Sequence, residues 1–100
     1  MNMQALMKQA QAMQKEITSI KNEIDNTVFE GSSSFVNVKV KGTKEIVEIK
    51  ISDDAKEVVY DDISMLEDMI VVALNAAFAS VDKVTEEKMG KYSNMMNGLM

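Results

Sequence analysis

The residues of this chain that could do chemistry are mainly acids. Adjacent acids occur at Asp53–Asp54, Asp61–Asp62, Glu67–Asp68 and Glu86–Glu87. Side chains that are neighbours along a helix do not face one another, so such pairs make poor acid–base couples and poor metal cages. Most of them stand near expected helix starts, where the helix dipole favours acids. A solvated role explains these pairs better than catalysis or metal binding does.

Other catalytic groups are scarce. The chain has no His and no Cys, which removes the usual general base, the commonest metal ligand and any disulfide. Ser32, Ser33 and Ser34 therefore lack a His to activate them, and no GxxxxGK phosphate loop occurs. We expect a protein that is not an enzyme and that uses no cofactor or metal. The first 13 residues lack the continuous apolar core of a signal peptide, which favours a cytoplasmic location.

The lysines are distributed unevenly, and this matters more than the net charge of −5. Residues 1–15 carry Lys8 and Lys15 without any acid, and residues 83–100 carry three lysines against two Glu. Residues 53–82 carry eight acids against Lys56. The acids therefore lie in the middle of the sequence and the lysines toward both ends. The chain has no Arg, so bidentate reading of guanine is not expected.

A long amphipathic helix is expected from about Asn2 to Asn26. Its apolar residues recur at alternating spacings of three and four, which is the pattern of a heptad seam. A helix with so narrow an apolar stripe needs a partner helix, and its methionines are interpreted as core residues rather than ligands. The seam consists of Met3, Leu6, Ala10, Met13, Ile17, Ile20 and Ile24.

Residues 27–51 are expected to form a three-stranded antiparallel meander. Its first strand is Thr27–Gly31, followed by a loop over Gly31–Ser34. The segments FVNVKVK and EIVEIKI then alternate apolar and polar residues on either side of a four-residue loop. The apolar face needs a cover, and the two helices are the only candidates. The apolar rows are expected to pair as Val36–Ile51, Val38–Ile49 and Val40–Val47, with Lys39, Lys41 and Lys50 on the opposite, solvated face.

The chain is organised around the segment Met65–Val81. From Met69 to Ala79 only Asn75 is polar, and a helix that is apolar nearly all round is expected to be buried on most sides. One small domain cannot supply that much cover, so a second copy is expected to cover part of the helix. Eleven apolar residues between charged ends are too short to span a bilayer. The expected dimer interface is Met69, Ile70, Ala73, Leu74, Ala77 and Phe78.

Capping signals set the ends of this last helix. Asp61, Asp62 and Ser64 are candidate N-caps, and Ser64 with Glu67 fits a capping box. Gly90 marks the expected end. We therefore predict one domain over residues 1–92, of α+β class and order α-β-β-β-α, with residues 93–100 as a flexible, Met-rich tail.

Antiparallel packing of the two helices along their seams would bring the start of the first beside the end of the last. Lysines there would act as point charges on phosphates, giving affinity for DNA without a base code. From charge alone, a solvated face with pairs such as Glu87–Lys91 is the simpler interpretation. The lysines expected at this distal tip are Lys8, Lys15, Lys83, Lys88 and Lys91.

Two segments, LMKQAQAMQKEI (Leu6–Ile17) and MLEDMIVVALNAA (Met65–Ala77), resemble the signature segments of the YbaB/EbfC family of bacterial nucleoid-associated proteins. The order of helix, meander and long helix matches that family over about residues 1–90. The resemblance implies a tweezer-like homodimer that binds DNA through its projecting helices with little sequence preference. Three features depart from the family pattern: Ser32–Ser34 replaces a glycine-rich loop, no proline follows the third strand, and the tail lacks the usual proline segment.

Three classes of function remain open. The first is a dimeric nucleoid protein that binds duplex DNA through the distal lysines. The second is a dimeric adaptor or scaffold that binds another protein and has little DNA affinity. The third is an unrecognised enzyme, which the lack of His and Cys makes the weakest. The resemblance favours the first, so we predict duplex DNA as the partner, no membrane or small-molecule partner, and a location at the nucleoid in the cytoplasm.

Overall fold

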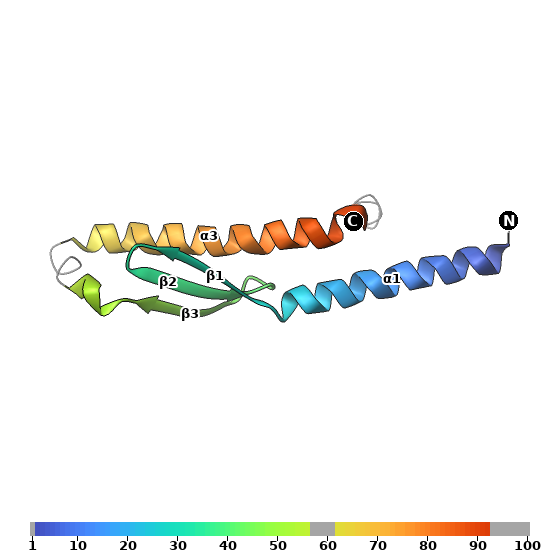
Figure 1. Cartoon of the computed structure of the whole chain (residues 1–100), viewed down its shortest axis with the longest axis horizontal. Coiled ribbons are helices and arrows are strands. Elements are labelled where there is room, and N and C mark those ends of the chain that lie inside the picture. Colours follow the sequence, from blue (N-terminus) through green and yellow to red (C-terminus); the bar gives the residue numbers. More distant parts are fainter. Residues whose placement is uncertain (1, 57–61, 93–100) are drawn as a thin grey trace.

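A computed structural model describes residues 2–56 and 62–92 and shows a three-stranded sheet covered by one long helix, with a second long helix of opposite direction extending from the end of the sheet (Figure 1). The molecule is elongated, with principal-axis extents of 71 × 19 × 17 Å. This arrangement confirms the predicted α+β class and the α-β-β-β-α order. The elements are α1 (Met3–Asp25), β1 (Val28–Ser33), β2 (Val36–Lys41), β3 (Ile46–Ile51), the short 3-10 turn η1 (Asp53–Ala55), α3 (Ile63–Met89) and the 3-10 turn η2 (Gly90–Tyr92).

Helix α1 has the predicted bounds but not the predicted position. The side chain of Asn2 caps its start by accepting a hydrogen bond from the backbone N–H of Gln4 at 3.0 Å, and Asn26 follows its last residue. The two helices were the only candidates to cover the sheet, and α3 alone lies along it. Only the last part of α1 packs against the rest of the chain, while its first half projects beyond the sheet and beyond the end of α3 (Figure 1).

The sheet has the order β1-β2-β3 with antiparallel neighbours, as predicted. Its first hairpin differs from our expectation, because β1 continues through Ser33 and leaves only Ser34 and Phe35 in the turn. A two-residue hairpin turn favours positive φ, and Ser34 has φ 48°. The predicted loop over Gly31–Ser34 was therefore too long.

The second hairpin keeps two of its three predicted apolar pairs. Val36 pairs with Ile51 and Val38 with Ile49, but Val40 pairs with Ile46 rather than with Val47. A bulge shifts the register between Lys39 and Val40. Such a bulge places an extra residue on one strand and increases the local twist, which strict alternation in the sequence cannot indicate.

Helix α3 lies along β1 and β2, and this contact forms the core (Figure 1). Val36, Val38 and Val40 are at most 1% exposed on the covered face of β2, and Ala73 and Ala77 are fully buried on α3. Small residues permit a close approach here. A Cβ atom added to Gly31 of β1 would lie 2.2 Å from the backbone oxygen of Ala73. A glycine is therefore needed at position 31 because α3 packs closely against β1 there, and not because this residue lies in a loop.

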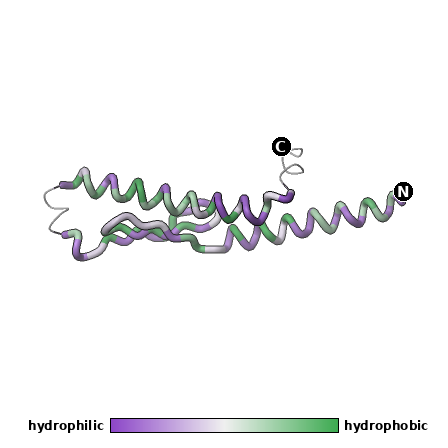
Figure 2. The backbone as a smooth tube through the Cα atoms, turned by 45° about the horizontal axis from the view of Figure 1, so that its top comes forward, coloured by the Kyte–Doolittle hydropathy of each residue, from purple (hydrophilic) through white to green (hydrophobic). Residues whose placement is uncertain are grey.

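Strand β3 lies at the open edge of the sheet, and its apolar side chains are not covered. Ile46, Val47, Ile49 and Ile51 are between 41% and 51% exposed. Figure 2 shows that hydrophobic residues recur along both long helices as well as in the sheet. The predicted apolar face therefore exists, but one chain covers only part of it.

The start of α3 is capped by Asp62, whose side chain accepts a hydrogen bond from the backbone N–H of Met65 at 3.1 Å. Ser64 lies inside the helix, so the predicted capping box with Glu67 was wrong. Gly90 ends the helix, as predicted. By length and composition alone, Ile63–Tyr92 would also pass for a membrane span, as the core helix of a soluble protein can. The tail of residues 93–100 lies outside the described residues.

Candidate functional site

The first half of α1, Met3–Lys15, forms what we call the arm. It carries Lys8 and Lys15 and no acid. Both lysines are exposed, and within residues 2–56 and 62–92 neither ammonium group takes part in an ion pair. Two positive charges on a projecting, acid-free helix suit contact with a polyanion.

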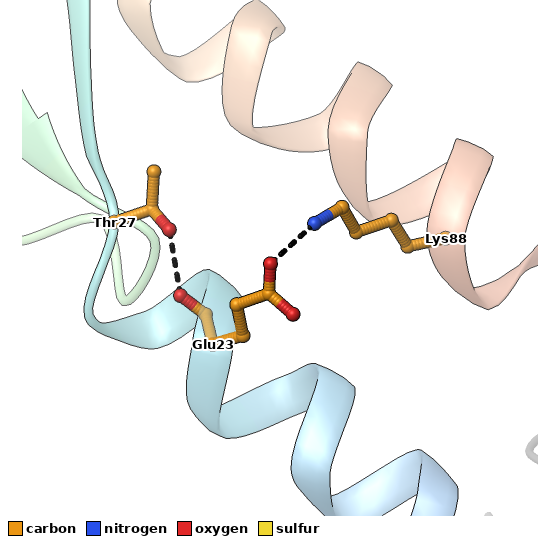
Figure 3. Close-up of polar contacts among 3 residues, drawn as sticks. All are labelled: Glu23, Thr27 and Lys88. Atoms are coloured by element: carbon orange, nitrogen blue, oxygen red, sulfur yellow. Dashed lines mark hydrogen bonds and ion pairs between the residues drawn. The ribbon is translucent and has the colours of Figure 1, made fainter.

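Lys88 lies beside the last turn of α1 and is already paired. Its Nζ donates to Oε1 of Glu23 at 2.7 Å, and the backbone oxygen of Glu23 accepts a hydrogen bond from Oγ1 of Thr27 at 2.6 Å (Figure 3). Glu23 therefore links the end of α1 both to α3 and to the start of the sheet. The charge of Lys88 is partly neutralised, which lowers its value for binding an anion.

Lys91 forms a second link further along α1. Its Nζ lies 3.5 Å from Oε1 of Glu16 and 5.0 Å from the ring centroid of Tyr92, a buried residue. Hydrogen bonding from Tyr92, followed by the charge of Lys91, lowers the pKa of Glu16. Hydrogen bonding to Tyr92 and the charge of Glu16 raise the pKa of Lys91, and the hydrogen bond with Glu16 raises the pKa of Tyr92.

The five predicted lysines do not share one distal tip. The first half of α3 lies over the sheet, so its end reaches only the middle of α1, where Lys91 meets Glu16 beside Lys15. Lys83 lies closer to the sheet, because its neighbour Asp82 pairs with Lys44 of the β2–β3 loop at 3.1 Å. Lys88 lies between these two levels. Lys8 is therefore furthest out, on the part of α1 that α3 does not reach.

The sheet lysines lie on the face away from α3, and one of them, Lys39, belongs to a charge ladder that our sequence reasoning missed. Nζ of Lys39 lies 3.8 Å from carboxylate oxygens of both Glu30 and Glu48, its cross-strand partners in the register. Lys41 pairs with Glu45 at 3.8 Å. Opposite charges at matched positions of the three strands were the signal that could have revealed the ladder.

The predicted interface residues divide into two groups. Ala73 and Ala77 are 0% exposed within a single chain, so they have no surface left for a second copy. The other four are half-buried at the edges of the contact between α3 and the sheet: Met69, Ile70, Leu74 and Phe78. Other exposed apolar residues, which we did not predict for an interface, lie on α3 and on β3, namely Val71, Val72, Ile46, Val47, Ile49 and Ile51.

The acidic pairs are not assembled into a metal site in the described part of the chain. Across residues 2–56 and 62–92, no group of three acids is placed so that it could hold a metal ion. Asp53 pairs with Lys56 at 3.6 Å, and Asp62 caps α3. Asp61 lies outside the described residues.

Comparison with known proteins gives one consistent result. A model of the YbaB/EbfC DNA-binding family matches residues 1–96. A nucleoid-associated protein of Ligilactobacillus salivarius is 42% identical over 101 residues, which cover 99% of this chain and 95% of the relative. A nucleoid-associated protein of Lactococcus lactis subsp. cremoris is 39% identical over 95 residues, which cover 93% of this chain and 94% of the relative.

A solved structure has the same fold. The crystal structure of the uncharacterized protein HP0035 from Helicobacter pylori matches with a TM-score of 0.68, covering 96% of this chain and 98% of that one. The sequence identity is 22%, so this likeness concerns the fold alone.

Proposed function

Because this chain belongs to the YbaB/EbfC DNA-binding family, we propose that it binds duplex DNA as a homodimer, with little sequence specificity, through lysines of its projecting helices. The observation that carries this proposal is the arm. It extends past the sheet and past the end of α3, and its lysines are not engaged by acids of the described chain. A net charge of −5 is compatible with DNA binding when the positive charge lies away from the acids.

The lysines contribute unequally in this proposal. Lys8 and Lys15 contact phosphates first, because no ion pair has to be broken. Lys83 adds a contact closer to the sheet. Lys88 and Lys91 contribute less, since Glu23 and Glu16 already neutralise part of their charge. The three sheet lysines act mainly as a solvated scaffold, and Lys39 in particular is held between two acids.

Low sequence specificity follows from the chemistry of the available cations. Lysine is a compact point charge, whereas the commonest specific base contact in the major groove is a bidentate one from Arg to guanine. The chain has no Arg. Contacts with phosphates fix the position of a protein on DNA but carry no sequence information directly. We further propose that the protein acts at the nucleoid, in the cytoplasm.

The proposed dimer is supported by the apolar surface that one chain leaves uncovered. Strand β3 exposes its apolar row at the open edge of the sheet, and Val71 and Val72 of α3 are 55% and 54% exposed. An open strand edge and exposed apolar side chains on a helix are both typical of surfaces that contact another protein. We assign this surface, together with half-buried Leu74 and Phe78, to the contact with a second copy.

Sedimentation tests the dimer with two variants. Leu74→Asp places an unpaired carboxylate at a half-buried position, which costs several kcal/mol and unfolds the chain or splits the dimer. Val71→Asp changes a side chain that is exposed in the single chain, one helical turn before Leu74, and should split the dimer while circular dichroism remains that of the folded chain. A wild-type chain that sediments as a stable monomer at micromolar concentration would disprove the dimer.

Titration of duplex DNA tests the proposed function. Fluorescence anisotropy with several random duplexes of equal length should show affinities that differ little between sequences and fall steeply as salt rises. The adaptor alternative is supported by the same exposed apolar surface, and it predicts no DNA binding by the folded dimer even at low salt. That result would reject the proposed function.

A further inference from the structure

The arm carries a narrow row of polar side chains on the side of α1 opposite the apolar seam. With about 3.6 residues per turn, the members of this row fall within about 60° of the helix circumference. All of them are exposed, as is every residue from Asn2 to Ala12. We call this set the polar row, and it consists of Gln4, Lys8, Gln11 and Lys15.

The helix holds the polar row in a fixed order from its first member onward. The side chain of Asn2 accepts a hydrogen bond from the backbone N–H of Gln4 at 3.0 Å and so caps the first turn. At about 1.5 Å per residue, the row is about 16 Å long and its neighbours lie about 4.5 to 6 Å apart along the axis. Amide and ammonium groups therefore alternate along one line.

The side chains of the polar row are not engaged by the described chain. Among residues 2–56 and 62–92, none of them takes part in an ion pair or a side-chain hydrogen bond. The arm has no acid that could attract them. At the end of α3, by contrast, Lys88 already donates to Glu23 at 2.7 Å. The donors of the polar row are thus available to a ligand outside the chain.

A phosphate backbone suits the amides of this row as well as its lysines. The Gln side chain has two N–H donors, and Gln is among the uncharged residues that bond phosphate oxygens in complexes with DNA. Duplex DNA carries one phosphate per about 1.7 Å of its axis, so a row about 16 Å long faces more phosphates than two ammonium groups contact.

The alignment of the row favours phosphates over bases as the partners of the amides. Gln can also pair with the edge of an adenine in the major groove. The amides lie on the same line as Lys8 and Lys15, however, so they face the same backbone when these lysines contact phosphates. A contact with the backbone also needs no particular base sequence.

We propose that Gln4 and Gln11 donate hydrogen bonds to phosphate oxygens beside Lys8 and Lys15, so that half of the polar row binds DNA without charge. This inference rests on the proposed function, because it assigns further residues to the same DNA site. Uncharged contacts add affinity but release no counterions. The arm therefore binds DNA more tightly than the salt dependence due to its two lysines indicates.

Two matched double variants test the role of the amides. Gln4→Ala with Gln11→Ala removes both amides of the polar row. Gln9→Ala with Gln14→Ala removes two amides of the same arm that lie about 90° or more away from the row. Ala favours helix more than Gln does, so both variants should fold, which circular dichroism checks.

Fluorescence anisotropy with a random duplex measures the affinity of each variant over a range of salt concentrations. We expect the row variant to bind about tenfold more weakly than the wild type, through the lost hydrogen bonds to charged groups. The control variant should bind as the wild type does. The slope of log affinity against log salt should stay the same in both variants, because Gln carries no charge.

The possible failures are distinguishable. A folded wild type that does not bind DNA would reject the proposed function, and the inference with it. Binding by the wild type with equal affinities for the row variant and the control would overturn the inference alone. Titration of duplexes made only of A·T or only of G·C pairs should show the same fold loss for the row variant. A loss confined to the A·T duplex would replace phosphate contact by adenine recognition and overturn the proposal.

Discussion

The two halves of this molecule use the same apolar pattern with opposite results. On α3, residues of one helical face place Ala73, Ala77 and Val81 against the sheet, where each is at most 2% exposed. On the arm, the corresponding face leaves Met3 and Leu6 largely exposed. The pattern thus identifies which residues form an apolar face, but the fold decides whether that face has a partner.

We expect the two regions to respond differently to substitution, the core through stability and the arm through DNA binding. The core of β2 and α3 contains closely packed backbone and small side chains, so changes there are expected to affect folding. The arm contacts little of the described chain and carries two lysines, Lys8 and Lys15, that form no ion pair among the described residues. We therefore expect substitutions on the arm to change DNA binding with little loss of stability.

The largest effect is expected from Gly31→Ala. Its new Cβ would lie 2.2 Å from the oxygen of Ala73 and 2.5 Å from the nitrogen of Ala77, and backbone atoms cannot easily move aside. We expect the free energy of unfolding to fall by about 3 kcal/mol in urea denaturation. Gly90→Ala is the matched control, since nothing lies within 4 Å of its added Cβ. Equal stability of the two variants would show that α3 does not approach β1 so closely.

A smaller effect separates the core from the arm. Val38 is 0% exposed, so Val38→Ala should lower the free energy of unfolding by about 2 kcal/mol through lost burial and a residual cavity. Met7 on the arm is 58% exposed, so Met7→Ala should change the free energy of unfolding by less than about 0.5 kcal/mol. Chemical denaturation of both variants measures the contrast. A comparable loss from Met7→Ala would mean that the arm belongs to the cooperative core.

The smallest effect concerns the link between Glu16, Lys91 and Tyr92. The pKa of Glu16 is lowered in the folded chain, so its ionised form stabilises the fold above its ordinary pKa of 4.5, and this contribution is lost as the pH falls through the lowered value. The pKa values of Lys91 and Tyr92 are raised, so their contributions are lost at the alkaline end, above about 10.

Glu16→Gln tests this link. The variant should be slightly less stable than the wild type at pH 7, and the difference should disappear in acid once Glu16 is protonated in the wild type. Urea denaturation of both proteins at the two pH values measures the effect, with Gln14→Glu as a control that alters charge on the same helix. A difference that persists unchanged in acid would show that the ionised carboxylate is not responsible.

The sequence predicted local structure well where one residue type has one physical role. Asn2 and Asn26 bound α1, Gly90 ends α3, and alternating valines form the buried row of β2. The sequence-based prediction failed where the local structure depends on how separate elements pack against one another. The bulge opposite Val40, the short turn at Ser34 and the projection of α1 depend on how the elements pack, which no periodicity reports.

The candidate site shows the same division. The sequence identified the lysines toward the chain ends, but not which of them are paired. Lys88 and Lys91 meet Glu23 and Glu16 only because α3 ends beside the middle of α1, 65 and 75 residues away in sequence. Lys8 lies further out and is left free of carboxylates in the described chain. The family resemblance implied a projecting helix, and the structure adds which of its lysines form no ion pair.

The central claim is that the arm holds the DNA, and the salt dependence of binding tests it most directly. For the Lys8→Gln, Lys15→Gln double variant, a dimer loses four lysines, so the slope of log affinity against log salt should decrease in magnitude by up to about 3.6. The Lys41→Gln, Lys50→Gln variant removes as many charges from the sheet and should retain the wild-type slope, with circular dichroism showing that both variants are folded. An unchanged affinity and slope in the arm variant, with a loss in the sheet variant, would contradict this account.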